Sequence, residues 1–406
     1  MRRNGAGEKI VHSRAGEDVP GSRLLLVSEV YPPTIGGSGV LMEGIYTRVQ
    51  GARVTVLTDG HGTSGDGVEN GVAVLRRPVA ARTWGVLSVT GLRAHVRLAW
   101  RIWRLLRRRD GLVHCARALP EGVAARLSQL FGGPGYVCWA HGEDLATARA
   151  SREFTFLTSW VFRGARAALA NSRNTAEMLG AFGVPQNIRH VVYPAVDANR
   201  FHPDVDGADV RRLYAAPDDT LLLSVGRLQR RKGHDVVIRA IAALNRDLPG
   251  LRYVIAGEGD ERTRLEQLAG AEHVQDRVFF VGSVGDEALP AYYAAADMFV
   301  LPNRIDTDGD IEGFGIVFLE AAAAGRPVIG GRSGGVPEAV EDGVTGLLVD
   351  GSDVEAVAAA IRELAVSPET RRRMGRDGRA RVLARFTWDQ AARSVSDLQR
   401  RLIDAR

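Results

Sequence analysis

Residues 298–329 read MFVLPNRIDTDGDIEGFGIVFLEAAAAGRPVI: an apolar run, a glycine-containing loop, an alanine-rich helical stretch and a second apolar run. The runs Met298–Leu301 and Pro327–Ile329 have no polar interruption. Such runs are typical of strands that are covered by helices on both faces. A strand, a helix and a second strand in this order form a parallel βαβ unit. The stretch therefore predicts an α/β domain with a parallel sheet.

The same alternation extends over nearly the whole chain. In the second half it predicts strands at Thr220–Val225, Arg252–Ala256, Val278–Val281 and Gly346–Val349, and helices at about 233–245, 260–269, 286–295, 315–324 and 353–365. In the first half it predicts strands at Arg23–Val30, Arg53–Thr58, Val72–Arg77, Leu112–Cys115, Tyr136–Ala140, Ala167–Ala170 and His190–Tyr193. We therefore expect two doubly wound α/β domains facing a cleft, with ligands at the carboxyl ends of the strands.

Polar stretches suggest where the domains begin and end. Residues 1–22 are polar, glycine-rich and charged, without the apolar centre of a signal peptide, and are expected to form a disordered tail. The turn-rich residues 195–210 are expected to link an N-terminal domain, 23–195, to a C-terminal domain, 211–385. Residues 386–406 have the spacing of an amphipathic helix.

Composition excludes several classes of protein. Apolar residues make up 45% of the 406 residues and charged residues 25%, as in ordinary globular proteins. The two cysteines, Cys115 and Cys138, cannot form a disulfide framework or a four-thiolate zinc site, and they suit the reducing cytoplasm. No apolar run approaches the roughly 20 residues of a membrane span.

The net charge of +5 could indicate nucleic acid or an anionic membrane as a partner. Only Lys9 and Lys232 of the 53 basic residues are lysine, however, and this bias is typical of a GC-rich genome. We therefore expect no nucleic-acid partner. The lysine at 232, beside Arg230 and Arg231, suggests that a compact ammonium is needed there.

In each half of the chain, one glycine-containing loop follows the first predicted strand. PPTIGGSG at 32–39 contains Gly36 and Gly37 and precedes a helix, where a backbone can approach an anion, although a simple tight turn fits equally well. It is neither a Walker loop nor a GxGxxG fingerprint. In SVGRLQRRKG at 224–233, Arg227 and Lys232 can converge on a diphosphate. The alternative for this loop is a solvated basic surface.

Two further loops carry polar side chains toward the same cleft. In EGFGIVFLE at 312–320, Glu312 lies in a glycine loop and Glu320 in an apolar helix, where a carboxylate needs a partner such as a sugar hydroxyl. A helix cap plus a surface glutamate is the plainer interpretation. His141 follows the predicted strand YVCWA and is expected to point into the cleft as a hydrogen-bond donor or proton carrier, unless it is structural.

Together these loops resemble the retaining glycosyltransferases of family 4, which have the GT-B fold. The resemblance covers about residues 23–400, and the spacing of Glu312 and Glu320 is its most specific element. The stretch 302–321 with PVIGGRSGGVPEAV at 327–340 looks particularly like bacterial phosphatidylinositol mannosyltransferases.

The resemblance implies a role for each matching residue. Arg227 and Lys232 would hold the donor diphosphate, Glu320 the ribose and Glu312 the hydroxyls of the donor sugar. His141 would lie near the anomeric carbon. The remaining donor contacts would come from Gly36, Gly37, Ser283, Val284, Gly313, Phe314, Gly315 and Ile316. The N-terminal domain would bind the acceptor, and the last helix would cross back onto that domain.

The implied reaction moves a hexose from a nucleotide-diphosphate sugar, GDP-mannose or a UDP-sugar, to a hydroxyl acceptor that is lipid-linked or a secondary metabolite. Arg227, Lys232 and backbone amides would stabilise the departing phosphate in place of a metal, and no cofactor is expected. Departure and attack on the same face retain the anomeric configuration, without a glycosidase-like acid pair.

Alternative functions remain open from sequence alone. Asp306, Asp308 and Asp310 have the first spacings of a calcium loop, but Ile311 and Val317 replace its glycine and last glutamate. The same acidic run lies in the wrong half of the chain for the metal-binding motif of the other glycosyltransferase fold. An oxidoreductase, a sugar-nucleotide epimerase of related fold, and a non-catalytic sugar-nucleotide-binding protein are the other candidates.

Residues 92–109, LRAHVRLAWRIWRLLRRR, form an arginine-rich helical pattern. The pattern places Arg93, Arg97, Arg101, Arg104 and Arg108 near one stripe, with Trp100 and Trp103 also present. Such a helix suits an anionic membrane, and a lipid-linked acceptor would place the protein on the inner face of the plasma membrane. The alternative is a sheet-covering helix with a solvated arginine face.

Overall fold

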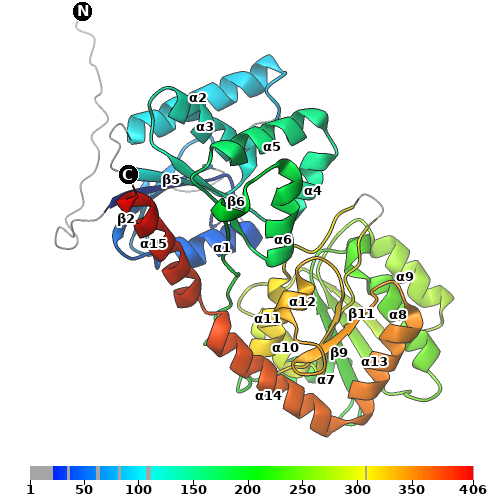
Figure 1. Ribbon diagram of the computed structural model, residues 1–406. Coiled ribbons are helices and arrows are strands. Elements are labelled where there is room, and N and C mark those ends of the chain that lie inside the picture. Colours follow the sequence, from blue (N-terminus) through cyan, green and yellow to red (C-terminus); the bar gives the residue numbers. More distant parts are fainter. Residues whose placement is uncertain are drawn as a thin grey trace, which may run out of the picture.

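The computed structural model describes residues 22–33, 37–60, 65–80, 84–106, 111–306 and 309–405. Two parallel sheets organise these residues, one in each half of the chain (Figure 1). The prediction of two doubly wound sheets is confirmed. The expected tail at 1–22 lies, apart from Ser22, outside the described residues.

The N-terminal sheet has eight strands in the order β3-β4-β2-β1-β5-β6-β7-β8, all parallel except for the β3–β4 pair. The central strands β5, β6 and β7 are wholly buried, and β1 is buried from its third residue onward. The strands are β1 (Ser22–Ser28), β2 (Ala52–Thr58), β3 (Gly67–Glu69), β4 (Val72–Arg76), β5 (Gly111–Cys115), β6 (Tyr136–Ala140), β7 (Ala167–Ala170) and β8 (Arg189–Val191).

The C-terminal sheet has six parallel strands in the order β11-β10-β9-β12-β13-β14. The largest buried side chains of this half include Tyr253 and Phe299 in the sheet and Tyr293 and Phe318 on helices. The strands are β9 (Thr220–Val225), β10 (Leu251–Ala256), β11 (Val278–Gly282), β12 (Met298–Leu301), β13 (Val328–Gly331) and β14 (Gly346–Val349).

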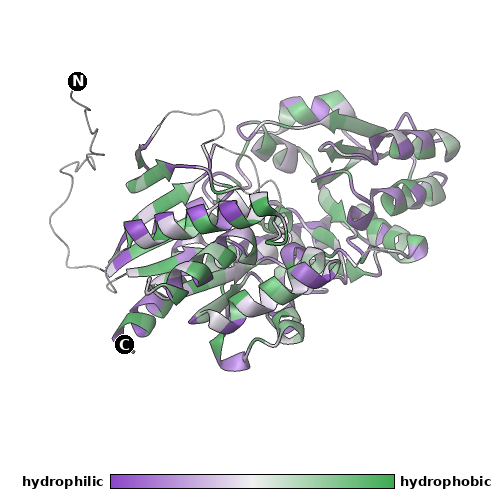
Figure 2. Ribbon diagram, turned by 90° about the horizontal axis from the view of Figure 1, so that it is seen from above, coloured by the Kyte–Doolittle hydropathy of each residue, from purple (hydrophilic) through white to green (hydrophobic). Residues whose placement is uncertain are grey.

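Helices cover both faces of each sheet, and hydrophobic strands lie between helices whose outward surfaces carry hydrophilic residues (Figure 2). In the first half these are α1 (Gly37–Tyr46), α2 (Val89–Leu105), α3 (Val123–Leu130), α4 (Glu143–Arg149), α5 (Arg152–Gly164) and α6 (Arg173–Met178). From the linker onward they are α7 (Ala208–Tyr214), α8 (His234–Leu244), α9 (Arg262–Ala271), α10 (Leu289–Ala295), α11 (Ile316–Ala323), α12 (Val336–Ala339), α13 (Val354–Val366), α14 (Pro368–Arg385) and α15 (Trp388–Asp404).

The last helix, α15, packs against α1 of the N-terminal half, with its end near the first strand (Figure 1). A Cβ on Gly44 would lie 2.4 Å from the Trp388 ring, so a larger residue would push the two helices apart. A buried chain of hydrogen bonds continues the contact, because Gln399 Oε1 lies 2.9 Å from His114 Nε2 and the Tyr46 hydroxyl lies 2.7 Å from His114 Nδ1. Burial lowers the pKa of His114 to about 4, so the ring is neutral.

The chain passes between the two halves at two places that pack together. Val196 N donates to Phe386 O at 3.0 Å, which joins the segment after β8 to the segment before α15. Tyr193 and Phe386 also contact Phe314, with ring centroids 5.7–5.8 Å apart. The connection between the halves is therefore an aromatic cluster that includes a residue of the predicted site.

No helix among the described residues is long and apolar enough to cross a membrane.

Candidate active site

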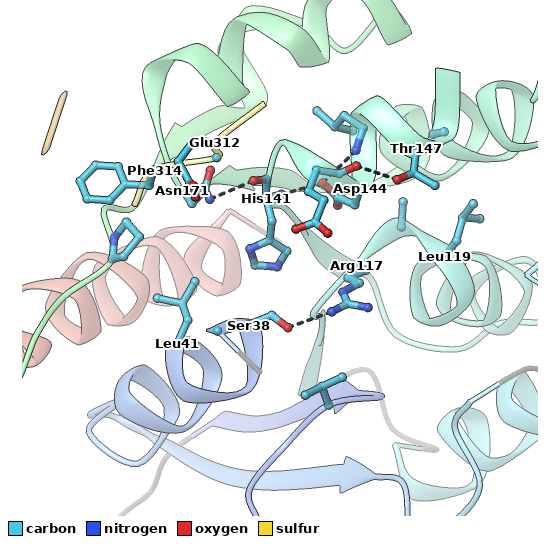
Figure 3. Close-up of a pocket in the computed structure, with 18 of the residues that line it drawn as sticks. Ser38, Leu41, Arg117, Leu119, His141, Asp144, Thr147, Asn171, Glu312 and Phe314 are labelled. Atoms are coloured by element: carbon cyan, nitrogen blue, oxygen red, sulfur yellow. Dashed lines mark hydrogen bonds between the residues drawn. The ribbon is translucent and has the colours of Figure 1, made fainter. Parts of the chain in front are cut away.

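The two sheets place their switch points opposite each other. In each sheet the strand order reverses between two neighbours, β1 and β5 in the first and β9 and β12 in the second. Loops that leave the carboxyl ends of such strands diverge and open a crevice. A cleft of about 680 Å³ lies there, lined by residues of both halves (Figure 3).

Most predicted site residues line this cleft. The structure brings together Gly37, His141, Arg227, Lys232, Glu312, Gly313, Phe314, Gly315 and Ile316. Glu320, Ser283 and Val284 are not among the residues that line it. Gly36 lies outside the described residues.

Glu312 is the centre of a buried charge cluster. Its Oε2 accepts hydrogen bonds from Lys232 Nζ at 2.5 Å, from Arg231 Nη1 at 3.0 Å and from Asn303 Nδ2 at 2.9 Å. Burial alone would raise the pKa of Glu312, but Lys232 and Arg231 outweigh it and hold that pKa below its ordinary value. The carboxylate is therefore ionised and already engaged by three donors.

Arg231 and Asn303 are two functional candidates that the sequence did not single out. The Arg231 side chain is 5% exposed and also pairs with Asp310 at 2.8 Å, so it is a buried structural cation rather than part of a solvated loop. Asn303 follows β12 at the switch point. Asn303 could have been found from its position at the end of a predicted strand. Nothing in the run of three basic residues, 230–232, indicates that Arg231 is the most deeply buried of them.

Glycine fixes the approach of the Lys232 loop to the next strand. Gly233 has φ +75°, and a Cβ there would lie 2.3 Å from Pro302 O. Any other residue would therefore be strained and would also clash with backbone. This close contact carries Lys232, from the loop after β9, to Glu312, in the loop after β12.

The two halves touch through backbone at the cleft floor. A Cβ on Gly313 would lie 2.1 Å from His141 O, and the same carbonyl accepts from Asn171 Nδ2 at 3.0 Å. Behind the Glu312 loop, Gly335 N donates to Glu312 O at 2.9 Å. Gly313 and Gly335 thus permit close contact on the two sides of the Glu312 loop.

His141 is held in one orientation by its neighbours. Its Nε2 lies 2.8 Å from Ala116 O, and its ring is stacked parallel to that of Trp139. Because a carbonyl oxygen only accepts, Nε2 carries the hydrogen. Burial lowers the pKa of His141, against the opposing influence of Asp144, so the ring is neutral and Nδ1 is an acceptor.

Side chains from the two halves also pair across the cleft. Arg227 Nη2 lies 3.3 Å from Glu143 Oε1, with both side chains more than half exposed. Outside the cleft lining, the Glu338 carboxylate joins the halves by accepting from the backbone N–H groups of Arg173 and Asn174 and from the Tyr193 hydroxyl, at 2.8–3.1 Å. The exposed pair contributes little to stability and is easily exchanged for another anion.

Glu320 occupies a separate, partly buried position on α11. Its Oε2 accepts a hydrogen bond from the Tyr293 hydroxyl at 2.7 Å, and burial raises its pKa. Ser283 and Val284 follow β11, which is an edge strand of the C-terminal sheet. The structure therefore does not join these three residues to the cleft around Lys232.

Glu121 is a buried acid near the cleft that sequence analysis did not identify. Its Oε1 accepts from Glu29 N at 2.8 Å, and burial raises its pKa to about 8, although Arg117 opposes the shift. A carboxyl whose folded-state pKa is raised stabilises the fold while it is protonated. That contribution is complete below the ordinary glutamate pKa and is lost as pH rises through about 8.

We expect Glu121→Gln to raise the melting temperature by about 3 °C or more at pH 8.5 and to change it little at pH 5, because the amide needs no proton. Thermal unfolding at both pH values measures the difference. The exposed Glu287→Gln removes the same charge and should show no such dependence. An equal shift of Glu121→Gln at both pH values would contradict the assignment.

Among the described residues, no three or more His, Cys, Asp or Glu side chains are grouped closely enough to hold a metal ion. Asp306 and Asp310 of the acidic run are described, and Thr307 and Asp308 lie outside the described residues.

Two doubly wound sheets that face an interdomain cleft make up the GT-B fold, and comparisons with known structures agree. Sucrose-phosphate synthase from Thermosynechococcus elongatus superposes with a TM-score of 0.78 at 23% identity, over 95% of this chain and all of that one. HepE from Anabaena, in complex with UDP and glucose, gives 0.77 at 19% identity, over 93% of this chain and 99% of that one. At these identities the likeness shows the fold.

Sequence comparison identifies the family. The family model "Glycosyltransferase Family 4" matches residues 36–200, and "Glycosyl transferases group 1" matches residues 208–381. A GDP-mannose-dependent alpha-(1-6)-phosphatidylinositol monomannoside mannosyltransferase of Mycobacterium tuberculosis is 32% identical over 93% of this chain and 98% of its own length. A D-inositol 3-phosphate glycosyltransferase of Streptomyces avermitilis is 38% identical over 51% of this chain and 46% of its own length.

The chain therefore belongs to glycosyltransferase family 4. It is a glycosyltransferase, rather than the oxidoreductase, epimerase or binding protein that the sequence left open.

Proposed function

We propose that this enzyme transfers a hexose from a nucleotide-diphosphate sugar to a hydroxyl acceptor, with retention of configuration and without a metal. The C-terminal domain, 211–385, would bind the donor, and the N-terminal domain, 23–195, the acceptor. One observation carries the proposal: the loop after β9 and the loop after β12 bring Lys232 and Glu312 together at a switch point, where Arg227 and His141 face the same cleft.

The cationic side of the cleft suits a diphosphate. Lys232 is 10% exposed and Arg227 is 63% exposed, so one supplies a fixed charge and the other a mobile one. A phosphate that reaches Arg227 competes with Glu143 for the guanidinium. The negative charge that builds on the departing β-phosphate is then stabilised by these two cations.

Retention is what the family resemblance implies, and in this proposal it needs no covalent intermediate on Glu312. The Oε2 of Glu312 is engaged by three donors, which suits hydrogen bonding to sugar hydroxyls better than attack on the anomeric carbon. In the reaction, the bond between the anomeric carbon and the phosphate oxygen breaks and a bond to the acceptor oxygen forms on the same face. The acceptor's proton passes to the departing phosphate oxygen.

His141 and Glu320 take supporting roles in this proposal. The neutral His141 ring, locked by Ala116 O, offers Nδ1 as an acceptor to a donor-sugar hydroxyl. Glu320 would bind the ribose, with the base beside Ser283 and Val284, once the donor extends from the cleft along the C-terminal sheet. Gly36, Gly37 and the backbone at 313–316 would lie against phosphate and hexose.

A thermal-shift screen with GDP-, UDP- and ADP-sugars in metal-free buffer tests the proposal. The M. tuberculosis relative is named as GDP-mannose-dependent, so we expect GDP-mannose to stabilise the protein most. Stabilisation by a UDP-sugar instead would change the donor and keep the mechanism. A strict requirement for Mn²⁺, or the absence of stabilisation by every sugar nucleotide, would contradict the proposal.

We further propose that α2 contacts an anionic membrane at the cytoplasmic face. Its outward surface combines exposed apolar and basic side chains, which we call the α2 patch: Val89, Leu92, Arg93, Val96, Arg97, Trp100 and Arg104. An apolar stripe flanked by arginine is typical of interfacial helices. The helix lies on the side of the N-terminal half away from the C-terminal sheet (Figure 1).

One arginine of the expected stripe, Arg101, does not belong to the α2 patch. Arg101 turns inward and donates to Pro78 O at 2.7 Å, so it is not part of the α2 patch. Arg107, Arg108 and Arg109 lie outside the described residues.

We expect Arg93→Glu/Arg97→Glu to abolish most flotation with vesicles containing phosphatidylinositol, because each basic residue near such a surface contributes about 1 kcal/mol. Arg372→Glu/Arg376→Glu on α14 makes the same change in net charge at exposed positions of the other half and serves as the control. Equal flotation of the two double variants would remove the membrane proposal and leave the transferase assignment intact.

A further inference from the structure

One part of the cleft differs in character from the rest. Away from Lys232, its lining comes from the turn Ala118–Gly122, from α4, from α5 and from the segment before α2, and it is mainly apolar apart from Glu143, Asp144 and Thr147 on α4 and Thr158 on α5. We call this part the apolar branch, lined by Trp84, Leu119, Leu145, Ala148, Phe154 and Thr158. Figure 3 shows Leu119 on one side of the His141 ring and Leu41 and Phe314 on the other.

Two aromatic rings form a fixed wall of this branch. Trp84 and Phe154 lie with ring centroids 6.5 Å apart and tilted by 47°, and both side chains are only partly buried. Glu153 holds the two segments together, because its Oε1 accepts from Val86 N at 2.6 Å and from Leu87 N at 3.0 Å. The wall is therefore preorganised rather than formed by a loose loop.

Two polar atoms within or beside the branch lack partners among the described residues. The Thr158 hydroxyl is buried, with the residue 1% exposed, and it forms no hydrogen bond, not even to the preceding turn of α5. Asp144 uses Oδ1 for His141 N and Leu145 N, while its buried Oδ2 has no partner. A buried polar group without a partner is destabilising, so each of these two atoms would gain from a hydrogen bond to a ligand bound in the branch.

We infer that the apolar branch binds a ring-bearing apolar body of the acceptor, with a polar group of that body on Thr158 and the reactive hydroxyl on Asp144. The inference rests on the proposed function, because the acceptor must reach the donor sugar near His141. The tilted rings of Trp84 and Phe154 favour a planar ring over a flexible chain. Asp144, on α4, lines the same cleft, and its Oδ2 positions the acceptor by accepting a hydrogen bond before the proton passes to the departing phosphate oxygen.

The position of Arg117 separates this subsite from the ionic part of the cleft. Its Nη2 donates to Ser38 Oγ at 2.9 Å, so it faces α1 rather than α5 (Figure 3). None of the six residues that define the apolar branch is charged. A strongly anionic acceptor body placed there would lose its hydration without a counterion, which is costly.

Binding of two probes to the full chain, saturated with the nucleoside diphosphate that the thermal-shift screen identifies, tests the inference. The probes are 4-methylumbelliferone, a planar aromatic alcohol, and D-inositol 3-phosphate, a polar one, both measured by titration calorimetry. We expect the aromatic alcohol to bind at least about tenfold more tightly, because burial of a ring in an apolar wall is favourable. Tighter binding of D-inositol 3-phosphate, or no binding of either probe, would overturn the inference.

Three variants locate the site. Phe154→Ala should weaken binding of 4-methylumbelliferone by about tenfold, whereas Phe156→Ala, two residues further on the same helix and exposed, should leave it unchanged. Thr158→Val should weaken it by about fivefold without lowering the melting temperature. If the Thr158 hydroxyl were only a packing defect, the valine variant would be equally or more stable and would bind the probe as wild type does.

Failure of the acceptor site and failure of the proposed function give different results in these experiments. Normal binding of the nucleoside diphosphate together with unchanged probe binding in Phe154→Ala and Thr158→Val would reject the apolar branch as the acceptor site and leave the proposed function standing. Failure of every nucleoside diphosphate to bind would instead reject the proposed function.

Discussion

Lys232→Gln is expected to lower kcat by about 10²–10³-fold in a protein that remains folded. Lys232 and Arg227 are the two cations assigned to the donor diphosphate. The Lys232 side chain is the less exposed of the two, so water screens its charge less. Removal of one fixed donor to a developing oxyanion typically has an effect of this size. Release of the nucleoside diphosphate from the donor measures the loss.

The variant keeps its fold because Glu312 retains partners. Arg231 and Asn303 still donate to Oε2, and the glutamine amide can donate in the place of the ammonium. Arg230→Gln is the matched control, since Arg230 is exposed in the same loop and pairs with Glu261. We expect the control to stay within about twofold of wild type. A kcat for Lys232→Gln within tenfold of wild type would contradict the assigned role.

Gly313→Ala is expected to lower kcat by about 10²-fold or more while the two halves remain folded. The added Cβ would lie 2.1 Å from His141 O, so the Glu312 loop and the His141 loop must move apart. A displacement of about 1 Å between reacting groups has a cost of this order. The test is turnover, accompanied by far-UV circular dichroism and thermal unfolding.

Gly270→Ala is the control for this substitution. Gly270 lies in α9, and a Cβ there has nothing within 4 Å. Alanine in a helix is more favourable than glycine, so we expect unchanged activity and equal or greater stability. Wild-type activity of Gly313→Ala would show that contact of the halves at this point is not needed for turnover.

The sequence predicted the parallel strands because burial on both faces leaves an unbroken apolar run. Thr220–Val225 and Met298–Leu301 are strands with the predicted bounds. The edge strand β3 was missed since its three residues are largely exposed and carry no apolar pattern. Helix α14 was also missed, because its dense arginines conceal the few buried positions, such as Met374 and Val382.

The site was predictable only as far as local motifs reach. The glycine loops indicated Lys232 and Glu312, which the structure joins at 2.5 Å. The partners that complete the cluster, Arg231 and Asn303, depend on how two loops pack against each other. The contact of Gly313 with His141 joins residues 172 positions apart in the sequence and arises only from the arrangement of the two halves.

The central claim is that the cationic side of the cleft binds the donor diphosphate. A crystal structure with the nucleoside diphosphate that stabilises the protein most tests it directly. The account predicts β-phosphate oxygens within hydrogen-bonding distance of Lys232 Nζ and of the Arg227 guanidinium, with the Arg227–Glu143 pair broken. A diphosphate bound beyond the reach of both cations would contradict it.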